Sequence, residues 1–248
     1  MNLVSIIIPY YRKKTFILET INSVLKQSYK YFEIIIVYDD QDKSDLTLIE
    51  NIKKKDNRIK LLLNDKNLGA GLSRNIGIKN SMGSFIAFLD ADDLWHYNKL
   101  EKQITYMIQN DYFITHTSYL IIDCNEKVLK KRTSKNLKYD DLIKSCDVGL
   151  SSVVIKRDIL KQEQFSDLKT KEDYLLWLKL AKKGFIFHAL KENLTFWRKS
   201  KNSLSSSISR KLFDGYNLYH KHLGNSFFKS LFLLLRLSFY YLWKNIKS

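Results

Sequence analysis

Apolar and polar positions follow two alternating periods along the first 110 residues. Short apolar runs predict four strands, at residues 3–9, 32–37, 59–63 and 84–89. Apolar residues that recur three and four positions apart predict helices with one buried face, at residues 15–27, 44–55, 72–80 and 99–110. Ser44 is the expected N-cap of the second helix. Strands that alternate with helices indicate an α/β fold, with a mostly parallel sheet covered by helices on both faces.

The pattern becomes less regular after residue 110. One further helix is predicted at residues 174–183, and strands at residues 112–122, 128–133, 148–155, 185–190 and 194–197. The sequence contains neither an internal repeat nor a low-complexity linker in this region. We therefore expect one composite domain to cover residues 1–205.

The C-terminal residues 206–248 have a different character. Residues 227–243 are very apolar and aromatic, but Lys229 and Arg236 interrupt the run. Because a bilayer-spanning helix needs about 20 predominantly apolar residues, a helix that lies in the membrane interface is the favoured interpretation. The alternatives are a helix packed on the domain or on a second subunit, and a true span. We thus expect a helical extension that associates with a membrane or forms an oligomer.

Composition narrows the class of protein. The chain has 248 residues and a net charge of +16, which favours anionic partners. Because no helix-turn-helix, zinc-finger or RNP-type motif accompanies the charge, we expect no nucleic-acid partner. Two cysteines without metal-ligand spacing favour a reducing compartment. The N-terminus lacks the basic and long apolar segments of a signal peptide, so a cytoplasmic location is expected.

Carboxylates cluster directly after the fourth predicted strand. The apolar residues 85–89 are followed by Asp90, Asp92 and Asp93. In an open α/β sheet, ligands bind at the carboxyl ends of the strands. Hard divalent cations prefer oxygen ligands and share them with substrate phosphates. The cluster predicts a site for a cation and a phosphate, although Asp92 or Asp93 could simply cap the next helix.

Four segments, taken in order, resemble the motifs of family 2 glycosyltransferases. They are SIIIPYY at residues 5–11, EIIIVYDD at 33–40, NLGAGLSRNIG at 67–77 and DADD at 90–93. The resemblance covers roughly residues 3–205. It implies the GT-A fold, with a single nucleotide-binding, Rossmann-like mixed sheet flanked by helices. It also implies an inverting enzyme that uses a nucleotide sugar, similar to bacterial enzymes of lipooligosaccharide, O-antigen or capsule synthesis.

The resemblance assigns several residues to the nucleotide. It implies that the backbone of Pro9, Tyr10 and Tyr11 lines the base pocket. An aspartate after the second strand accepts a hydrogen bond from the uracil imide N–H, and gapless matching gives this position to Asp39. Asp40 remains an alternative.

This chain departs from the family pattern at that turn. The family usually has Asp-Asp-Gly-Ser there, whereas this chain has Tyr38 in place of the first aspartate and Asp40-Gln41-Asp42 at the following positions.

The resemblance also divides the carboxylate cluster into roles. Asp90 and Ala91 are implied to face the nucleotide sugar, and Asp92 to bind Mn²⁺ or Mg²⁺. The metal would neutralise the diphosphate leaving group. Arg74, near a helix start, would contact nucleotide or diphosphate oxygens, unless it is an ordinary solvated residue. Asp93 would support the metal site or cap the next helix.

The acceptor side is implied by segments further along the chain. An acidic pair followed by an aromatic-rich helix carries the family's general base, which matches Asp173; Glu172 would contact the acceptor or orient the loop. Gly149 gives room on the acceptor side, and Trp197 and Arg198 open a segment that closes over the diphosphate. A histidine of that segment is replaced by Ser200, which leaves a third metal ligand in doubt.

These observations favour an inverting, metal-dependent glycosyltransferase. It would move a hexose or N-acetylhexosamine from a nucleotide sugar, in particular a UDP-sugar, onto a growing glycan. A lipid-linked glycan acceptor at the cytoplasmic face of the inner membrane would fit the basic C-terminal helix, with peripheral membrane contact through residues 227–243. Two alternatives are a sugar-phosphate nucleotidyltransferase and a catalytically inactive binding or scaffold module of a glycan-assembly complex.

Overall fold

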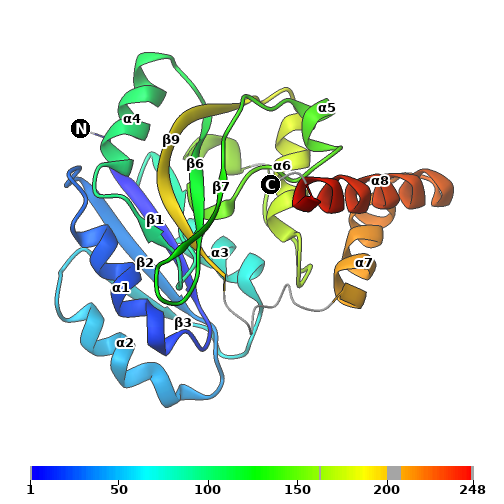
Figure 1. The fold of residues 1–248 in the computed structure, drawn as a ribbon. Coiled ribbons are helices and arrows are strands. Elements are labelled where there is room, and N and C mark those ends of the chain that lie inside the picture. Colours follow the sequence, from blue (N-terminus) through cyan, green and yellow to red (C-terminus); the bar gives the residue numbers. More distant parts are fainter. Residues whose placement is uncertain (1, 162, 200–207, 247–248) are drawn as a thin grey trace.

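A mixed sheet forms the centre of the computed structural model, which describes residues 2–161, 163–199 and 208–246 (Figure 1). Nine strands join the sheet across these residues, in the order β3-β2-β1-β4-β8-β6-β9-β5, with β7 paired to β6. β1, β2, β3 and β4 are parallel, and β8 runs antiparallel to β4. The sheet therefore has a regular parallel half and a mixed half that meet at β4.

The parallel half follows the predicted alternation closely. Its strands are β1 (Val4–Tyr10), β2 (Phe32–Tyr38), β3 (Ile59–Leu63) and β4 (Phe85–Phe88). Its helices are α1 (Lys14–Leu25), α2 (Leu46–Lys53), α3 (Ala70–Lys79) and α4 (Lys99–Gln109). Successive residues of β1 point to opposite faces, so that Ile7 packs in one hydrophobic core and Ile6 and Ile8 in the other. Burial on both faces explains the continuous apolar runs of these strands.

The mixed half is built from β5 (Leu94–Trp95), β6 (Ile114–Ile122), β7 (Val128–Arg132), β8 (Val153–Lys156) and β9 (Phe187–Arg198). The prediction of two short strands over residues 185–197 was wrong, because β9 is one long strand. Its pairing with β6 shifts register between Thr117 and Tyr119, where the partner jumps from Leu190 to Asn193. The polar pair Lys191 and Glu192 is exposed at this irregularity and interrupts the apolar pattern, although the strand continues.

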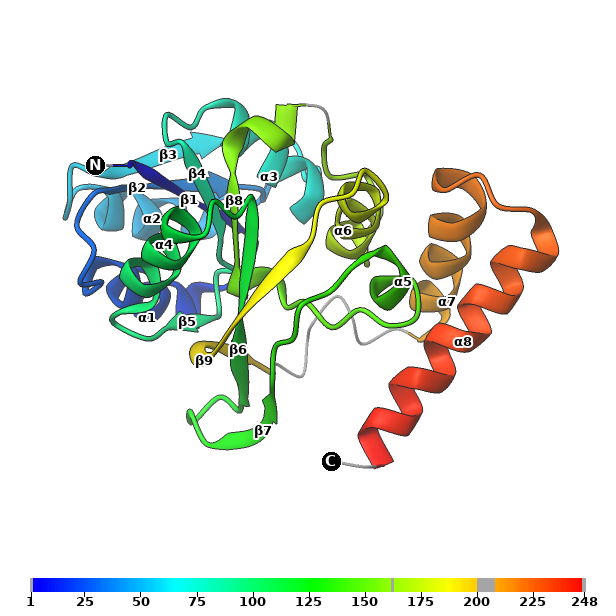
Figure 2. The same ribbon diagram turned by 90° about the horizontal axis from the view of Figure 1, so that it is seen from above.

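Helices of the C-terminal part lie at one side of the sheet. α6 (Glu172–Lys182) and the short α5 (Tyr139–Leu142) pack beside each other, and α7 (Ile208–Asn217) and α8 (Phe227–Ile246) lie next to them, away from α1 and α2 (Figures 1 and 2). Leu233 and Leu234 of α8 join the hydrophobic core that contains α6. In the part of the chain that the structure describes, no helix is long and apolar enough to cross a membrane.

The predicted cap at Ser44 was wrong, and of the two alternatives for Asp93 the helix cap is excluded. Ser44 lies inside a short 3₁₀ turn (Lys43–Asp45), and the carboxylate of Asp42 accepts the hydrogen bond from the Ser44 backbone N–H. Asp93 caps no helix, because strand β5 follows it and α4 begins only at Lys99. In both cases the carboxylate accepts a hydrogen bond from a backbone or side-chain group that the local sequence pattern does not indicate.

Candidate active site

The carboxyl ends of β1, β2 and β4 meet at one edge of the sheet, where we find most of the predicted site residues. Asp39 follows β2, and Asp90, Asp92 and Asp93 follow β4. We call Asp90, Asp92 and Asp93 the donor-edge carboxylates. The first turn of α6 carries Glu172 and Asp173, which we call the helix-start pair. Arg74 contacts both groups, so the two acidic groups belong to one site.

Arg74 is the central cation of this site. Its guanidinium lies 2.7 Å from an Asp90 oxygen and 2.7 Å from a Glu172 oxygen. Only 3% of its surface is exposed, and burial opposes its charge, but the two carboxylates outweigh burial and raise its pKa. Its two terminal nitrogens thus form ion pairs with two protein carboxylates, while its buried Nε has no hydrogen-bond partner among the described residues. Arg74 is not a solvated helix residue.

The donor-edge carboxylates have different partners. Asp92 accepts a hydrogen bond from the Lys13 ammonium at 2.5 Å. Asp93 is buried and accepts from the Ser151 hydroxyl at 2.5 Å and from the Arg198 backbone N–H at 2.9 Å. Asp90 is the most exposed of the three and bears the ion pair with Arg74. The cluster therefore leaves Asp90 partly exposed, whereas Asp92 and Asp93 are buried and Asp93 serves as an internal anchor.

Burial governs the ionisation of this cluster. Burial raises the pKa of Asp92, and the adjacent Lys13 ammonium partly opposes that rise. Burial and the neighbouring Asp92 raise the pKa of Asp93 well above its ordinary value. A cation placed at Asp92 would favour its charged form, as Lys13 already does.

Asp173 has the ionisation expected of a general base. Burial raises the pKa of its carboxyl to about 7, and the adjacent Glu172 adds to the rise while Arg74 opposes it. One carboxylate oxygen accepts from the Tyr174 backbone N–H at 2.7 Å. A pKa near neutral pH allows a carboxylate both to take a proton and to release it.

The turn before α6 is tightly packed against α3. Lys171, the residue before the helix, has a left-handed backbone with φ of 63°. A Cβ added at Gly71 of α3 would lie 2.5 Å from the Ser166 backbone oxygen and 3.1 Å from Glu172 Cγ. Glycine at position 71 is therefore needed for the close approach that brings Glu172 to Arg74.

Asp39 holds the segment that leads into α3. Its carboxylate accepts hydrogen bonds from the backbone N–H groups of Leu68 and Gly69 and from the Asn64 side-chain amide, each at 2.8 Å. A carboxylate offers about four acceptor positions, so one remains for a further donor. Asp40 is buried and pairs with Arg12, with a nitrogen–oxygen distance of 2.8 Å.

The residues at the end of β1 differ in the burial and the contacts of their side chains. Tyr10 is buried, stacks on Tyr38 and donates its hydroxyl to Asp45 at 2.7 Å. Its backbone oxygen accepts from the Asp39 N–H, which ties the two strand ends together. Pro9 is partly buried, whereas Tyr11 is exposed next to the Arg12 guanidinium.

The predicted lid residues lie beside the donor-edge carboxylates. Arg198 ends β9 with 3% exposure and donates to the Asp92 backbone oxygen, to the Cys124 backbone oxygen and to Glu19. Trp197 is 38% exposed. Ser200 and the rest of the predicted segment, to residue 205, lie outside the described residues.

Two predicted neighbours of the site serve backbone packing. A Cβ added at Gly149 would meet the Tyr119 ring at 3.0 Å, so glycine allows this approach. Ala91 is buried, and its backbone oxygen accepts from the Thr20 hydroxyl at 3.1 Å.

Sequence reasoning missed Lys13 and Ser151 as partners of the carboxylates. Lys13 lies in a basic run after β1, and Ser151 lies in the 3₁₀ turn (Leu150–Ser152) before β8. Neither sits in a spacing pattern that distinguishes it from a solvated lysine or an ordinary turn serine. Both partnerships join residues more than fifty positions apart and depend on the folded sheet.

The residues present fit a divalent cation only in part. Across the described ranges, no group of three or more His, Cys, Asp or Glu side chains is arranged to hold a metal ion. Asp92 already binds a cation, the Lys13 ammonium, which shows that positive charge is accommodated at this point. Two carboxylates with further oxygens from a diphosphate match the ligand preference of Mg²⁺ or Mn²⁺.

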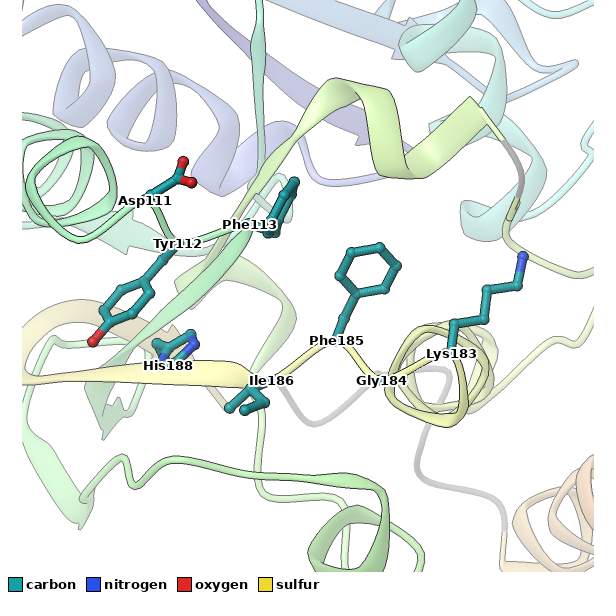
Figure 3. Close-up of a pocket in the computed structure, with 8 residues that line it drawn as sticks. All are labelled: Asp111, Tyr112, Phe113, Lys183, Gly184, Phe185, Ile186 and His188. Atoms are coloured by element: carbon teal, nitrogen blue, oxygen red, sulfur yellow. The ribbon is translucent and has the colours of Figure 1, made fainter.

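A separate pocket of about 320 Å³ lies at the other edge of the sheet (Figure 3). It is lined by residues 111–113, which precede β6, by residues 183–186, which precede β9, and by His188 at the start of β9. Tyr112 stacks on His188 there. β6 and β4 both run antiparallel to β8, so β6 starts at the edge where β4 starts. The donor-edge carboxylates follow the end of β4, and this pocket is therefore not part of their site.

Comparison with known proteins gives a consistent result. Residues 5–162 match the family model described as Glycosyl transferase family 2. Escherichia coli WfgD, named a UDP-Glc:alpha-D-GlcNAc-diphosphoundecaprenol beta-1,3-glucosyltransferase, is 39% identical over 214 residues, which cover 85% of this chain and 82% of WfgD.

Solved structures share the fold. S. aureus TarS, residues 1–349, in complex with UDP-GlcNAc, matches with a TM-score of 0.73 and 19% identity over 94% of this chain and 70% of that chain. The mannosyltransferase PcManGT from Pyrobaculum calidifontis, in complex with GDP-Man and Mn²⁺, matches with a TM-score of 0.66 and 14% identity over 90% of this chain and 64% of that chain. The curled sheet flanked by helices is the GT-A fold predicted from the sequence.

Proposed function

This chain belongs to glycosyl transferase family 2 and is a glycosyltransferase, and from that membership we propose that it transfers a hexose or N-acetylhexosamine from a UDP-sugar to a bacterial surface glycan. The observation that carries the proposal is the environment of Asp173. Its carboxyl has a pKa of about 7, and it lies beside Glu172, which forms an ion pair with Arg74. The name of WfgD, with its UDP-glucose donor and diphosphoundecaprenol acceptor, supports this choice of substrates.

In the proposed reaction Asp173 is the general base. Its carboxylate takes the proton from an acceptor hydroxyl while that oxygen attacks the anomeric carbon of the donor sugar. The bond from the anomeric carbon to the diphosphate breaks, and the nucleoside diphosphate leaves with the bonding electrons on its oxygen. Attack from the side opposite the diphosphate inverts the configuration. A positioned base of this kind contributes about 10²–10⁴-fold to the rate.

We assign the leaving group to the donor-edge carboxylates. Asp92 would hold Mn²⁺ or Mg²⁺, and that ion would offset the charge that develops on the diphosphate, while Asp90 would face the nucleotide sugar. The Lys13 ammonium at Asp92 supports this assignment because it occupies the same carboxylate with positive charge. The Mn²⁺ named with the mannosyltransferase structure supports the choice of metal.

We assign the nucleotide base to the ends of β1 and β2. The backbone of Pro9, Tyr10 and Tyr11 would line the base pocket, and Asp39 would accept from the uracil imide through its remaining acceptor position. Asp40 is the less favoured reader, since Arg12 already pairs with it. Ala91 would contact the donor through its backbone, as its buried side chain suggests.

We further propose that the acceptor is lipid-linked and that residues 206–248 bring the GT-A domain, residues 1–205, to the cytoplasmic face of the inner membrane. Aromatic and leucine side chains form an exposed stripe along one face of α8: Phe228, Leu231, Phe232, Leu235 and Phe239. They recur three and four residues apart, while Leu233 and Leu234 point into the core. Lys229 is exposed beside the stripe, and basic groups favour an anionic bilayer surface.

The experiment for the proposed function is a donor screen. Purified protein with Mn²⁺ is incubated with UDP-glucose, UDP-galactose, UDP-GlcNAc or UDP-GalNAc and a short-chain α-GlcNAc-diphospholipid, and UDP release and lipid product are measured. We expect one donor to give a product enlarged by one sugar. Absence of product with all four donors, from a protein shown to be folded, would contradict the proposed substrates.

A further inference from the structure

Helix α7 of the C-terminal extension reaches the turn that begins α6. Asp214 on α7 is 6% exposed, and one of its carboxylate oxygens accepts two hydrogen bonds from Thr170. The backbone N–H of Thr170 donates at 2.9 Å and its hydroxyl at 2.8 Å. Since α6 starts at Glu172, this contact holds the chain two residues before the helix-start pair.

The held turn has a backbone that few side chains adopt. Lys171, between Thr170 and Glu172, is left-handed with φ of 63° and ψ of 17°. A non-glycine residue keeps this conformation only where its surroundings enforce it. The Lys171 side chain lies against α7, because a Cβ added at Gly215 would come 3.2 Å from Lys171 Cε. Asp214 and Gly215 thus fix the turn from the same side.

The Thr170–Lys171 turn determines where both side chains of the helix-start pair lie. Directly after Lys171, Glu172 meets Arg74 at 2.7 Å, and Arg74 meets Asp90 at 2.7 Å. The Lys171 backbone oxygen accepts from the Leu175 N–H at 3.0 Å, which is the first hydrogen bond of α6. If the turn relaxed, Glu172 would move from Arg74, and the Asp173 carboxylate would turn with the end of the helix.

We propose that Asp214 is a positioning residue for sugar transfer, which keeps the Thr170–Lys171 turn in the form that aims Asp173 at the acceptor hydroxyl. The inference rests on the proposed role of Asp173 as the base. In this role Asp214 would contact no substrate. It makes α7 a functional part of the active site, although α7 lies outside residues 5–162 that match the family model.

The test compares Asp214→Ala and Asp214→Asn in the full chain. An asparagine carbonyl oxygen has two lone pairs and can still accept both Thr170 hydrogen bonds, whereas alanine accepts none. We expect Asp214→Ala to lower kcat for transfer by about tenfold or more, as the loss of alignment of a general base predicts, with the donor KM within about twofold of wild type. Asp214→Asn is expected to restore kcat to within about threefold.

The pH profile separates positioning from general damage. In Asp214→Ala the base becomes more solvated, so the acid limb of kcat should move from about pH 7 to lower pH, because burial is the main cause of the raised Asp173 pKa. Ser5→Ala is the matched control, since Ser5 is also buried with two hydrogen bonds, to Glu33 and from Gly83, at the other edge of the sheet. Thr170→Val, which removes only the hydroxyl donor, should give a smaller change in the same direction.

Three results would overturn the inference: Asp214→Ala with wild-type kcat and acid limb, a loss of kcat no greater than that of Ser5→Ala at equal thermal stability, or a loss that Asp214→Asn does not restore. If Asp214→Ala does not fold, the acid limb of Thr170→Val decides, and an unchanged limb rejects the positioning role. Failure of the proposed base is seen separately, because Asp173→Asn would then retain transfer in a chain with Asp214 intact.

Discussion

The donor-edge carboxylates and the helix-start pair are both acidic, but the protein holds them in different ways. The donor edge is anchored within the sheet region, through Lys13 on Asp92 and through Ser151 and Arg198 on Asp93. The helix-start pair stands on a left-handed turn that α3 packs from one side and α7 holds from the other. Arg74 joins the two groups.

This difference matches the two tasks proposed for the groups. A group that offsets the charge of a leaving diphosphate must be rigid before the reaction starts, and strand ends supply that rigidity. A base has to follow an acceptor that arrives from outside, and a helix start with a near-neutral pKa suits proton transfer.

Among changes to the helix-start pair, loss of the Asp173 carboxylate should lower the rate of transfer most. Asp173→Asn is expected to lower kcat for transfer by about 10²–10⁴-fold while the donor KM stays within about twofold, because the amide cannot accept the acceptor proton. Initial rates of UDP release at saturating donor measure this. Asp167→Asn, an exposed change on the segment before α6, is the control. Transfer at the wild-type rate by Asp173→Asn would remove Asp173 as the base.

Loss of the Asp92 carboxylate at the donor edge should lower both the rate of transfer and its dependence on the metal. Asp92→Ala is expected to lower kcat by about 10²–10³-fold, the usual size of a lost electrostatic contribution to a developing anion. It should also abolish the response of the rate to added Mn²⁺. The exposed Asp158→Ala serves as the control. Equal rates and equal Mn²⁺ dependence in Asp92→Ala and wild type would exclude Asp92 as the ligand.

The proposed base should also give the rate of transfer a characteristic dependence on pH. The base works as a carboxylate, so kcat should rise about tenfold per pH unit below the Asp173 pKa of about 7 and level off above it. The raised pKa is the reason that the rise falls near neutral pH and not near pH 4. A rate measured from pH 5 to 9 with saturating Mn²⁺ checks this, and a flat profile between pH 5 and 7 would contradict it.

Lys13 offers a smaller test at the donor edge. In Lys13→Met the metal no longer displaces an ammonium from Asp92. A partly exposed ion pair contributes about 1 kcal/mol, so Mn²⁺ binding should tighten about fivefold. Isothermal titration with MnCl₂ alone measures this without turnover. Lys14→Met is the neighbouring control, since that lysine faces Asp45 and is well exposed. Weaker Mn²⁺ binding by Lys13→Met would argue against a shared position.

The α8 stripe should have the smallest effect on the chemistry. Phe228→Ser with Phe232→Ser is expected to leave UDP release with a water-soluble acceptor within about twofold of wild type, and to reduce co-sedimentation with phosphatidylglycerol vesicles by about tenfold, since two large apolar side chains leave the interface. Tyr31→Ser with Tyr97→Ser, two exposed aromatics elsewhere, is the control. Unchanged vesicle binding, with a shift from dimer to monomer in solution, would assign the stripe to a second copy.

Much of the fold could be predicted from the sequence, and the reason is local. The strands of the parallel half are buried on both faces, so their composition alone separates them from the helices around them. β9 was predicted as two strands because its exposed Lys191 and Glu192 break the apolar run, while the pairing with β6 that keeps it continuous is not local. Ser44 was predicted as a cap because serine is a common cap, but Asp42 was better placed for that role.

The candidate site was predictable as a set of residue types and not as a set of contacts. The positions of Asp39, Asp90, Asp92 and Asp173 were recognisable because ordered motifs mark the ends of strands and the start of a helix. Their partners were not. Asp39 holds the residues before α3, and Arg74 pairs with carboxylates 16 and 98 positions away. No spacing rule connects residues at such separations.

The family, the alternation of strands and helices, and the location of the acidic residues at strand and helix ends all follow from the sequence alone, because apolar patterning and motif order are properties of neighbouring residues. The folded structure was needed to show that Lys13 faces Asp92, that Arg74 joins the two acidic groups, and that Asp214 of α7 holds the turn before Asp173. These are contacts between distant segments, and they exist only once the sheet and the C-terminal helices have brought those segments together.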